Sequence, residues 1–125
     1  MFDRLSAYAP QALAVLRIVA ALLFILHGTQ KLFGFPTAQG PTELLSLYGL
    51  AGLIEIIGGL LILVGFYTRP AAFIASGMMA VGYFMVHSPM NFFPTNNFGD
   101  AAILFCFVFL YLVFAGPGAW SVNKK

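Results

Sequence analysis

Four long apolar stretches, separated by short polar or turn-rich segments, dominate the pattern of this chain. Each stretch holds roughly 18 to 24 residues, about the length with which a helix crosses a ~30 Å hydrocarbon core. Glycine, proline and asparagine gather between the stretches, where they favour turns. The pattern predicts an all-α fold, an integral membrane four-helix bundle that forms a single domain. The expected helices cover about 11–34, 43–66, 70–88 and 98–115 of residues 1–125.

Local signals support these helix boundaries. Pro10 and Pro70 suit the first turns of the first and third helices, because an N–H in the first turn has no partner within the helix. Thr42 is a suitable N-cap for the second helix, since its hydroxyl can accept from a free N–H of the first turn. Asn96 or Asn97 would cap the fourth helix in the same way.

The basic residues indicate how the bundle is oriented. Four membrane spans place both termini on the same side of the membrane. Arg4, Arg69, Lys124 and Lys125 belong to that side, and Lys31 belongs to the opposite side. Because short cytoplasmic segments carry the excess of Lys and Arg, we predict that both termini lie in the cytoplasm.

Composition supports a membrane protein and excludes several other classes. With 61% hydrophobic and 8% charged residues, the chain has too few polar groups to cover a soluble protein. The net charge of +2, without a basic cluster, does not favour a nucleic-acid partner. The single cysteine, Cys106, excludes an intrachain disulfide and a Cys-x-x-Cys redox pair.

One carboxylate, Glu55, lies near the middle of the second apolar stretch. A charged side chain at this depth costs about 2.5–3.5 kcal/mol on insertion scales, so it must face the bundle interior and be paired or protonated there. Gly52 and Gly59 share its helix face and would let another helix approach closely. Arg17 of the first helix lies within ~6 Å in depth, at ~1.5 Å per residue. We therefore predict a buried ion pair between Arg17 and Glu55, which a purely structural role would equally require.

A second polar group belongs to the end of the bundle that is opposite the termini. Helical spacing and the predicted topology allow these side chains to line a cavity open to the outside. Its lining would comprise His27, Lys31, Tyr83, His87, Asp100 and Tyr111. Simpler interpretations exist for several of them. Either histidine can donate to a backbone carbonyl, Lys31 can extend to the membrane surface, and Asp100 suits the positive end of a helix dipole.

A metal site in this group is a weaker prediction than no metal. Two histidines and a carboxylate would supply enough donors for zinc or non-haem iron. They belong to three different predicted helices, however, and no two have the close spacing of a metal motif. Haem ligation by both histidines is weaker still, because both lie on one side of the membrane with little apolar length between them.

Several short motifs, taken in their order and spacing, resemble the DoxX family of small four-helix bacterial membrane proteins. The resemblance covers nearly the whole chain. The motifs are Arg17, Leu26–Gly34, the Gly52-x-x-Glu55-x-x-Gly58-Gly59 core, Thr68–Ala72, Gly99–Ala101 and Gly116–Gly118. The acidic residue that opens the last helix is often Glu in the family, whereas this chain has Asp100. The resemblance implies a multi-pass protein of the bacterial cytoplasmic (inner) membrane, associated with quinone-linked redox or oxidative-stress systems.

Three functions remain open at this stage. The first, and the one that the resemblance favours, is a redox subunit that holds a quinone in the cavity. It would need redox partner proteins, because the chain has no cysteine set for an iron–sulfur cluster, no haem-attachment motif and no glycine-rich nucleotide loop. The second is a structural or assembly subunit without a ligand. The third is a small-molecule or proton-coupled carrier that acts as a homo-oligomer. No residue is predicted to be catalytic, and no covalent cofactor is expected.

Overall fold

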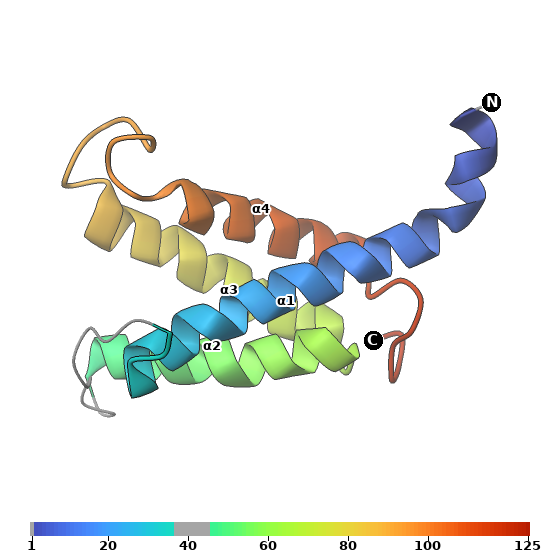
Figure 1. Cartoon of the computed structure of the whole chain (residues 1–125), viewed down its shortest axis with the longest axis horizontal. Helices are drawn as coiled ribbons and strands as arrows, with labels where there is room; N and C mark the ends of the chain where they lie inside the picture. Colours follow the sequence, from blue (N-terminus) through green and yellow to red (C-terminus); the bar gives the residue numbers. More distant parts are fainter. Residues whose placement is uncertain (1, 37–45) are drawn as a thin grey trace.

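The computed structural model describes residues 2–36 and 46–125, and this part of the chain holds helices and no strand (Figure 1). The predicted all-α fold with four main helices is confirmed. Its elements are the 3-10 helix η1 (Phe2–Tyr8), α1 (Ala9–Phe33), α2 (Leu47–Val64), α3 (Thr68–Gly82), the π-helical turn η2 (Tyr83–His87) and α4 (Asp100–Ala115). The predicted cap at Thr42 lies outside the described residues.

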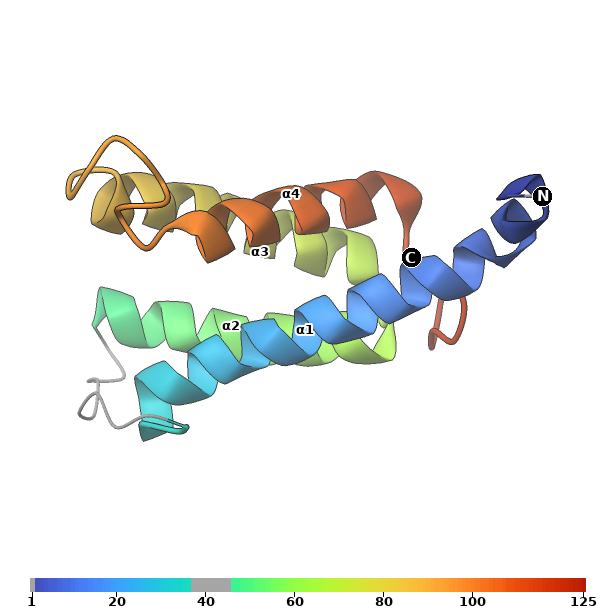
Figure 2. The ribbon, with the colours of Figure 1, turned by 45° about the horizontal axis from the view of Figure 1, so that its top comes forward.

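The four helices form two hairpins. α1 packs along α2, α3 packs along α4, and the two hairpins contact each other mainly through α2 and α3 (Figure 2). Both chain termini lie at the same end of the bundle, which we call the terminal end, and we call the opposite end the distal end (Figure 1). Which end faces the cytoplasm stays a prediction.

Three helical segments of the described chain are long and apolar enough to cross a membrane: residues 2–33, 47–64 and 68–87. α4 is apolar as well, but its 16 residues make it shorter than the predicted segment 98–115. At ~1.5 Å per residue it extends about 24 Å, less than the ~30 Å of a typical hydrocarbon core. It begins only at Asp100 because the chain before it forms a hydrogen-bonded loop.

Local chemistry explains where the helices begin and end. α1 and α2 both end at a left-handed glycine, Gly34 with φ 68° and Gly65 with φ 74°, a conformation that glycine adopts without strain. Ser46 begins α2 by accepting a hydrogen bond from the Gly49 N–H at 3.0 Å. α3 continues directly into the π-helical turn η2, where the Ser88 N–H donates to the Tyr83 carbonyl at 2.9 Å. Single π turns are rare and are often found at functional sites.

An aromatic cluster joins the two hairpins at the centre of the bundle. The ring of Phe24 on α1 lies 4.8 Å from that of Phe109 and 5.6 Å from that of Phe105, both on α4. Phe24 and Phe109 have no exposed surface, and Ile62 of α2 is equally buried beside them. These contacts hold α1 against α4 in the middle of the bundle, although the two helices share few other contacts.

Glycines allow α1 and α2 to approach unusually closely. A Cβ atom at Gly28 of α1 would lie 2.8 Å from the Gly52 carbonyl oxygen and 2.7 Å from the Ile56 Cγ1 on α2. A Cβ at Gly59 would lie 2.5 Å from the Ile25 Cγ1. Only glycine therefore fits at these crossing points, as is common where membrane helices pack tightly.

This contact predicts that Gly28→Ala destabilises the protein. The added methyl group meets backbone and the stem of Ile56, so the hairpin must spread, at a cost of about 1–3 kcal/mol. Unfolding of the purified protein in mixed detergent micelles, followed by circular dichroism, measures this cost. Gly58→Ala is the matched control, because a Cβ at Gly58 meets no described atom within 4 Å. Equal stability of the two variants would contradict the packing described here.

Candidate functional site

A cavity of about 660 Å³ lies between the two hairpins at the distal end. All four helices contribute to its wall. The lining comes from the last turns of α1, the first half of α2, the end of α3 with η2, and the first turns of α4. Most of the lining side chains are apolar. The lining groups able to carry charge are His27, Lys31, Glu55 and His87. The cavity therefore combines a largely apolar volume with a few polar groups, as small-molecule sites commonly do.

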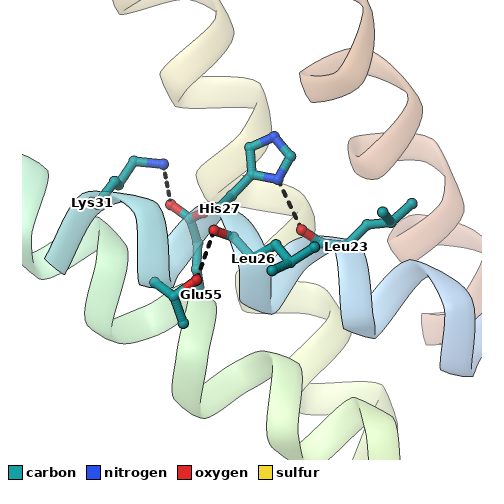
Figure 3. Close-up of polar contacts among 6 residues, drawn as sticks. Leu23, Leu26, His27, Lys31 and Glu55 are labelled. Carbon is teal, nitrogen blue, oxygen red and sulfur yellow. Dashed lines mark hydrogen bonds and ion pairs between the residues drawn. The ribbon is translucent and has the colours of Figure 1, made fainter. Parts of the chain in front are cut away.

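Glu55 and Lys31 form an ion pair across the α1–α2 contact (Figure 3). The Lys31 Nζ lies 2.5 Å from the Glu55 Oε1, and the carboxylate is fully buried. Lys31 also lies over the ring of Tyr48, with its Nζ 5.1 Å from the ring centroid. The predicted pairing of Glu55 with Arg17 is wrong. Glu55 faces the bundle interior as expected, but the cation that neutralises it comes from the distal end of α1.

The glycine contact explains this pairing. A Cβ at Gly28 would be 3.0 Å from the Cβ of Glu55, and one at Gly52 would be 3.2 Å from the Cβ of Lys31. The two charged residues therefore lie directly beside the glycines that bring the helices together. Among the described residues, the second carboxylate oxygen of Glu55, Oε2, is buried and has no hydrogen-bond partner. A buried acceptor without a partner is costly to the folded state.

The two histidines of the cavity come from opposite hairpins and share one arrangement. His27 Nδ1 lies 2.8 Å from the Leu23 carbonyl oxygen, and His87 Nδ1 lies 2.8 Å from the Asn97 carbonyl oxygen. A carbonyl only accepts, so in each ring Nδ1 carries the hydrogen, and this partner assigns the tautomer. The other ring nitrogen, Nε2, makes no hydrogen bond to the described residues in either ring. Figure 3 shows His27 with its ring held over α1 by the bond to Leu23.

Asn97 organises the loop that positions His87, a role that the sequence did not reveal. Its side chain is fully buried. The amide nitrogen donates to the Tyr83 Oη at 3.1 Å and to the Asn91 carbonyl at 2.9 Å, and Oδ1 accepts from the Gly99 N–H at 2.8 Å. The expected cap at Asn96 or Asn97 is wrong, because the N-cap of α4 is Gly99 and no side chain caps the helix; the bond between Asn97 and Gly99 lies in the turn before it. The bonds to Tyr83 and Asn91 cross the loop and could not be read from a local pattern.

The structure separates the predicted cavity residues into two groups. His27, Lys31 and His87 line the cavity, together with Glu55. Tyr83 lies behind His87, with the two rings stacked at 6.2 Å, and it is not part of the lining.

Asp100 and Tyr111 do not lie in the cavity either, because α4 buries its opposite face. Its buried residues are Phe105, Phe109 and Leu112. Tyr111 is 58% exposed, and Asp100 is exposed in the first turn of the helix. Both residues that were predicted for the cavity therefore face outward. The Asp100 carboxylate suits the positive end of the α4 dipole without any further role.

Arg17 lies at the terminal end of the bundle, where it binds backbone carbonyls. Its side chain is fully buried. The guanidinium donates to the carbonyl oxygens of Pro117 at 2.5 Å, Ala119 at 3.0 Å and Trp120 at 2.9 Å, and more distantly to that of Leu63 at 3.5 Å. Arg17 therefore attaches the C-terminal tail, residues 116–125, to α1 and to the end of α2.

Arg69 acts in a similar way on α4. Its guanidinium donates to the carbonyl oxygens of Val113 at 2.9 Å and Phe114 at 2.7 Å, which belong to the last turn of that helix. The last carbonyls of a helix lack partners within it and carry the negative end of its dipole, so a cation is favoured there. Arginine has enough donors to satisfy several such carbonyls at once.

Metal ligation finds little support in this geometry. Within residues 2–36 and 46–125, no three side chains of His, Cys, Asp or Glu gather closely enough to hold a metal ion. Cys106 lies away from the cavity, with its sulfur 3.6 Å from the Ser76 hydroxyl.

Comparison with protein families decides the classification. The DoxX family model matches residues 12–88, which is more than half of the chain. The chain belongs to the DoxX family. The match includes Arg17, His27, Lys31, Glu55 and His87, so every ionisable residue of the cavity lies within the part that resembles other DoxX proteins.

Individual relatives agree with this assignment. A protein of Haemophilus influenzae is 44% identical over 98% of this chain and 96% of its own length. The Escherichia coli inner membrane protein YqjF is 33% identical over 88% of each chain, and the inner membrane protein YphA of the same organism is 29% identical over 96% of this chain and 94% of its own. No solved structure matches the chain. Together with the three segments able to span a membrane, these relatives identify this DoxX protein as a multi-pass inner membrane protein.

The Lys31–Glu55 pair predicts a specific pattern of stability changes. Lys31→Met leaves a buried carboxylate without a counter-charge and should cost about 3–5 kcal/mol. The double variant Lys31→Met with Glu55→Gln should regain most of this loss, because it removes both charges. The free energy of unfolding in mixed micelles gives the coupling energy. Arg17→Met combined with Glu55→Gln is the control and should be additive, whereas strong coupling in that pair would favour the ion pair expected from the sequence.

The Arg17 contacts predict that Arg17→Met loosens the C-terminal tail. Loss of a charged donor to these carbonyls is worth about 1.5–3 kcal/mol, so exchange of tail amides should accelerate by roughly tenfold or more. Hydrogen–deuterium exchange of residues 116–125 measures this, and the Ala119 and Val122 N–H groups, bonded to Pro10 and Val64, should report it. Arg4→Met, at an exposed position of η1, should leave the exchange unchanged. An unchanged tail in Arg17→Met would contradict the assigned role.

Proposed function

We propose that this DoxX protein is a membrane subunit of a quinone-linked redox system and that it binds the quinone head group in the cavity between its hairpins. The observation that carries the proposal is the pair of histidines, His27 and His87, which line one cavity from opposite hairpins. Each ring is fixed by a bond from Nδ1 to a backbone carbonyl, which leaves Nε2 for a ligand.

The chemistry of the lining suits a quinone head group. Such a head group is a flat apolar ring with polar oxygens on two opposite sides. The cavity offers apolar walls from Ile54, Met78 and Phe105, and its volume of about 660 Å³ lies within the usual range for small-molecule sites. Polar groups are few and come from both hairpins.

The histidines can serve both redox forms of such a ligand. A neutral imidazole accepts a hydrogen bond from a hydroxyl through Nε2, and a protonated one donates to a carbonyl through the same atom. When bound, a quinone would supply two-electron, two-proton redox chemistry. The protein would supply orientation, exclusion of water and a place for protons at Nε2 of His27 and His87. Lys31 and Glu55 would keep this part of the cavity polar while adding no net charge.

The proposal assigns electron transfer to a partner protein. A single cysteine cannot ligate an iron–sulfur cluster, and the chain carries no haem-attachment motif or glycine-rich nucleotide loop. A subunit of this kind would hold the quinone within the membrane while its partner oxidises or reduces it.

A structural role is the alternative that specific contacts favour. Arg17 and Arg69 bind only backbone carbonyls in the described structure, and Lys31–Glu55 joins neighbouring helices of one hairpin. These groups would be needed in a subunit without any ligand. Nε2 of His27 and of His87 makes no hydrogen bond within residues 2–36 and 46–125 that would serve such a structural role, which is why we favour binding.

Quinone binding can be measured on the purified protein. Mass spectrometry of the extract from protein purified in mild detergent should reveal quinone at a near-stoichiometric ratio. Titration calorimetry with a short-tailed ubiquinone should give an affinity that His27→Leu weakens by about tenfold, the equivalent of one hydrogen bond of ~1.4 kcal/mol. His87→Leu should act similarly.

Asp100→Asn and Tyr111→Phe are the matched controls for this experiment. Both residues were predicted for the cavity but lie exposed outside it, so binding should be unaffected. Absence of quinone from the extract, together with absence of binding by the folded wild-type protein, would rule out the proposal and favour the structural role.

A further inference from the structure

The polar lining residues of the cavity come from α1, α2 and η2. His27 and Lys31 belong to α1, and His27 also contacts Phe105 of α4, with the ring centroids 5.3 Å apart. Glu55 lines the cavity from α2, and His87 lines it from η2. The apolar side of the lining comprises Leu50 of α2, Met78 and Val81 of α3, and Met85 of η2.

This apolar side continues onto the outer surface of the bundle. Leu50 of α2 is 51% exposed, and Val81 of α3 and Met85 of η2 are each 58% exposed, yet all three line the cavity. An exposed apolar side chain on a helix able to span the membrane suits contact with lipid. The hairpins also lie farther apart toward the distal end, where α2 and α3 diverge from their short link at residues 65–67 (Figure 2).

A glycine leaves space at the edge of this side. A Cβ built at Gly82, which lines the cavity, would meet no described atom within 4 Å. Met78 and Met85 lie on the same helical segment, and their flexible side chains adapt easily to an apolar guest.

We infer that the cavity opens sideways into the lipid between α2 and α3, and that its ligand is an amphiphile whose hydrocarbon tail leaves through this opening. This inference rests on the proposed function and extends it, because it assigns the natural ligand to the long-tailed, lipid-soluble quinones. The head group lies against the histidines, and the tail lies along Leu50, Gly82 and Met85. The ligand then enters from the bilayer and does not need to cross water.

The test compares two probes, a tail-less benzoquinone and the same benzoquinone with a decyl tail, on the full chain in lipid nanodiscs. Gly82→Leu fills the opening, so it should weaken binding of the decyl probe by about tenfold, a loss equivalent to ~1.4 kcal/mol, and leave the tail-less probe unchanged. Gly77→Leu is the matched control, because Gly77 lies on the same helix in equally open space but outside the lining. It should change neither affinity.

A second pair of variants, both in α2, tests the opening independently of any folding defect that Gly82→Leu causes in α3. Leu50→Trp blocks the opening from α2, whereas Ile57→Trp places the same side chain at a similarly exposed position of α2 outside the lining. Leu50→Trp should weaken binding of the decyl probe and leave binding of the tail-less probe unchanged, whereas Ile57→Trp should change neither affinity. Equal affinities of both probes in every variant, or equal weakening of both probes by Gly82→Leu and Leu50→Trp, would overturn the lateral opening and leave the head-group site intact. Failure of both probes to bind the wild-type protein would overturn the proposed function as well.

Discussion

The burial of one carboxylate inside an apolar bundle is the constraint on which the rest of this structure depends. Glu55 has no exposed surface, and it can be charged there only because Lys31 lies 2.5 Å away. That distance in turn requires α1 and α2 to approach closely, which the absence of side chains at Gly28 and Gly52 permits. The hairpin geometry and the polar wall of the cavity thus have one physical origin.

The two ends of the bundle differ in how their helices are packed. At the terminal end, Arg17 and Arg69 satisfy carbonyls that would otherwise be left without partners, and the helices are held together. At the distal end the hairpins separate around a cavity, and among the described residues the loop organised by Asn97 contributes to its shape. A ligand site needs such space, which a close-packed core does not offer.

The sequence predicted the helices well and their side-chain partners less well. Apolar length and turn residues were sufficient to locate all four helices, and helical periodicity correctly placed Glu55 on an inward face. The Arg17–Glu55 pairing failed because a sequence shows side chains but not the backbone carbonyls that Arg17 binds. The inward placing of Tyr111 failed because α4 is apolar on every face, so periodicity could not identify its buried side. Asn97 was seen only as a cap, since its other bonds span a loop.

The attachment of the tail has a consequence for how the protein is made. Arg17 lies in α1, whereas its three shorter hydrogen bonds go to carbonyls of residues 117, 119 and 120, about a hundred positions later in the chain. Until those residues have been translated, the guanidinium lacks most of its native acceptors, and an arginine without partners is costly inside the hydrocarbon core. The native environment of Arg17 is therefore completed only after α4 has been synthesised.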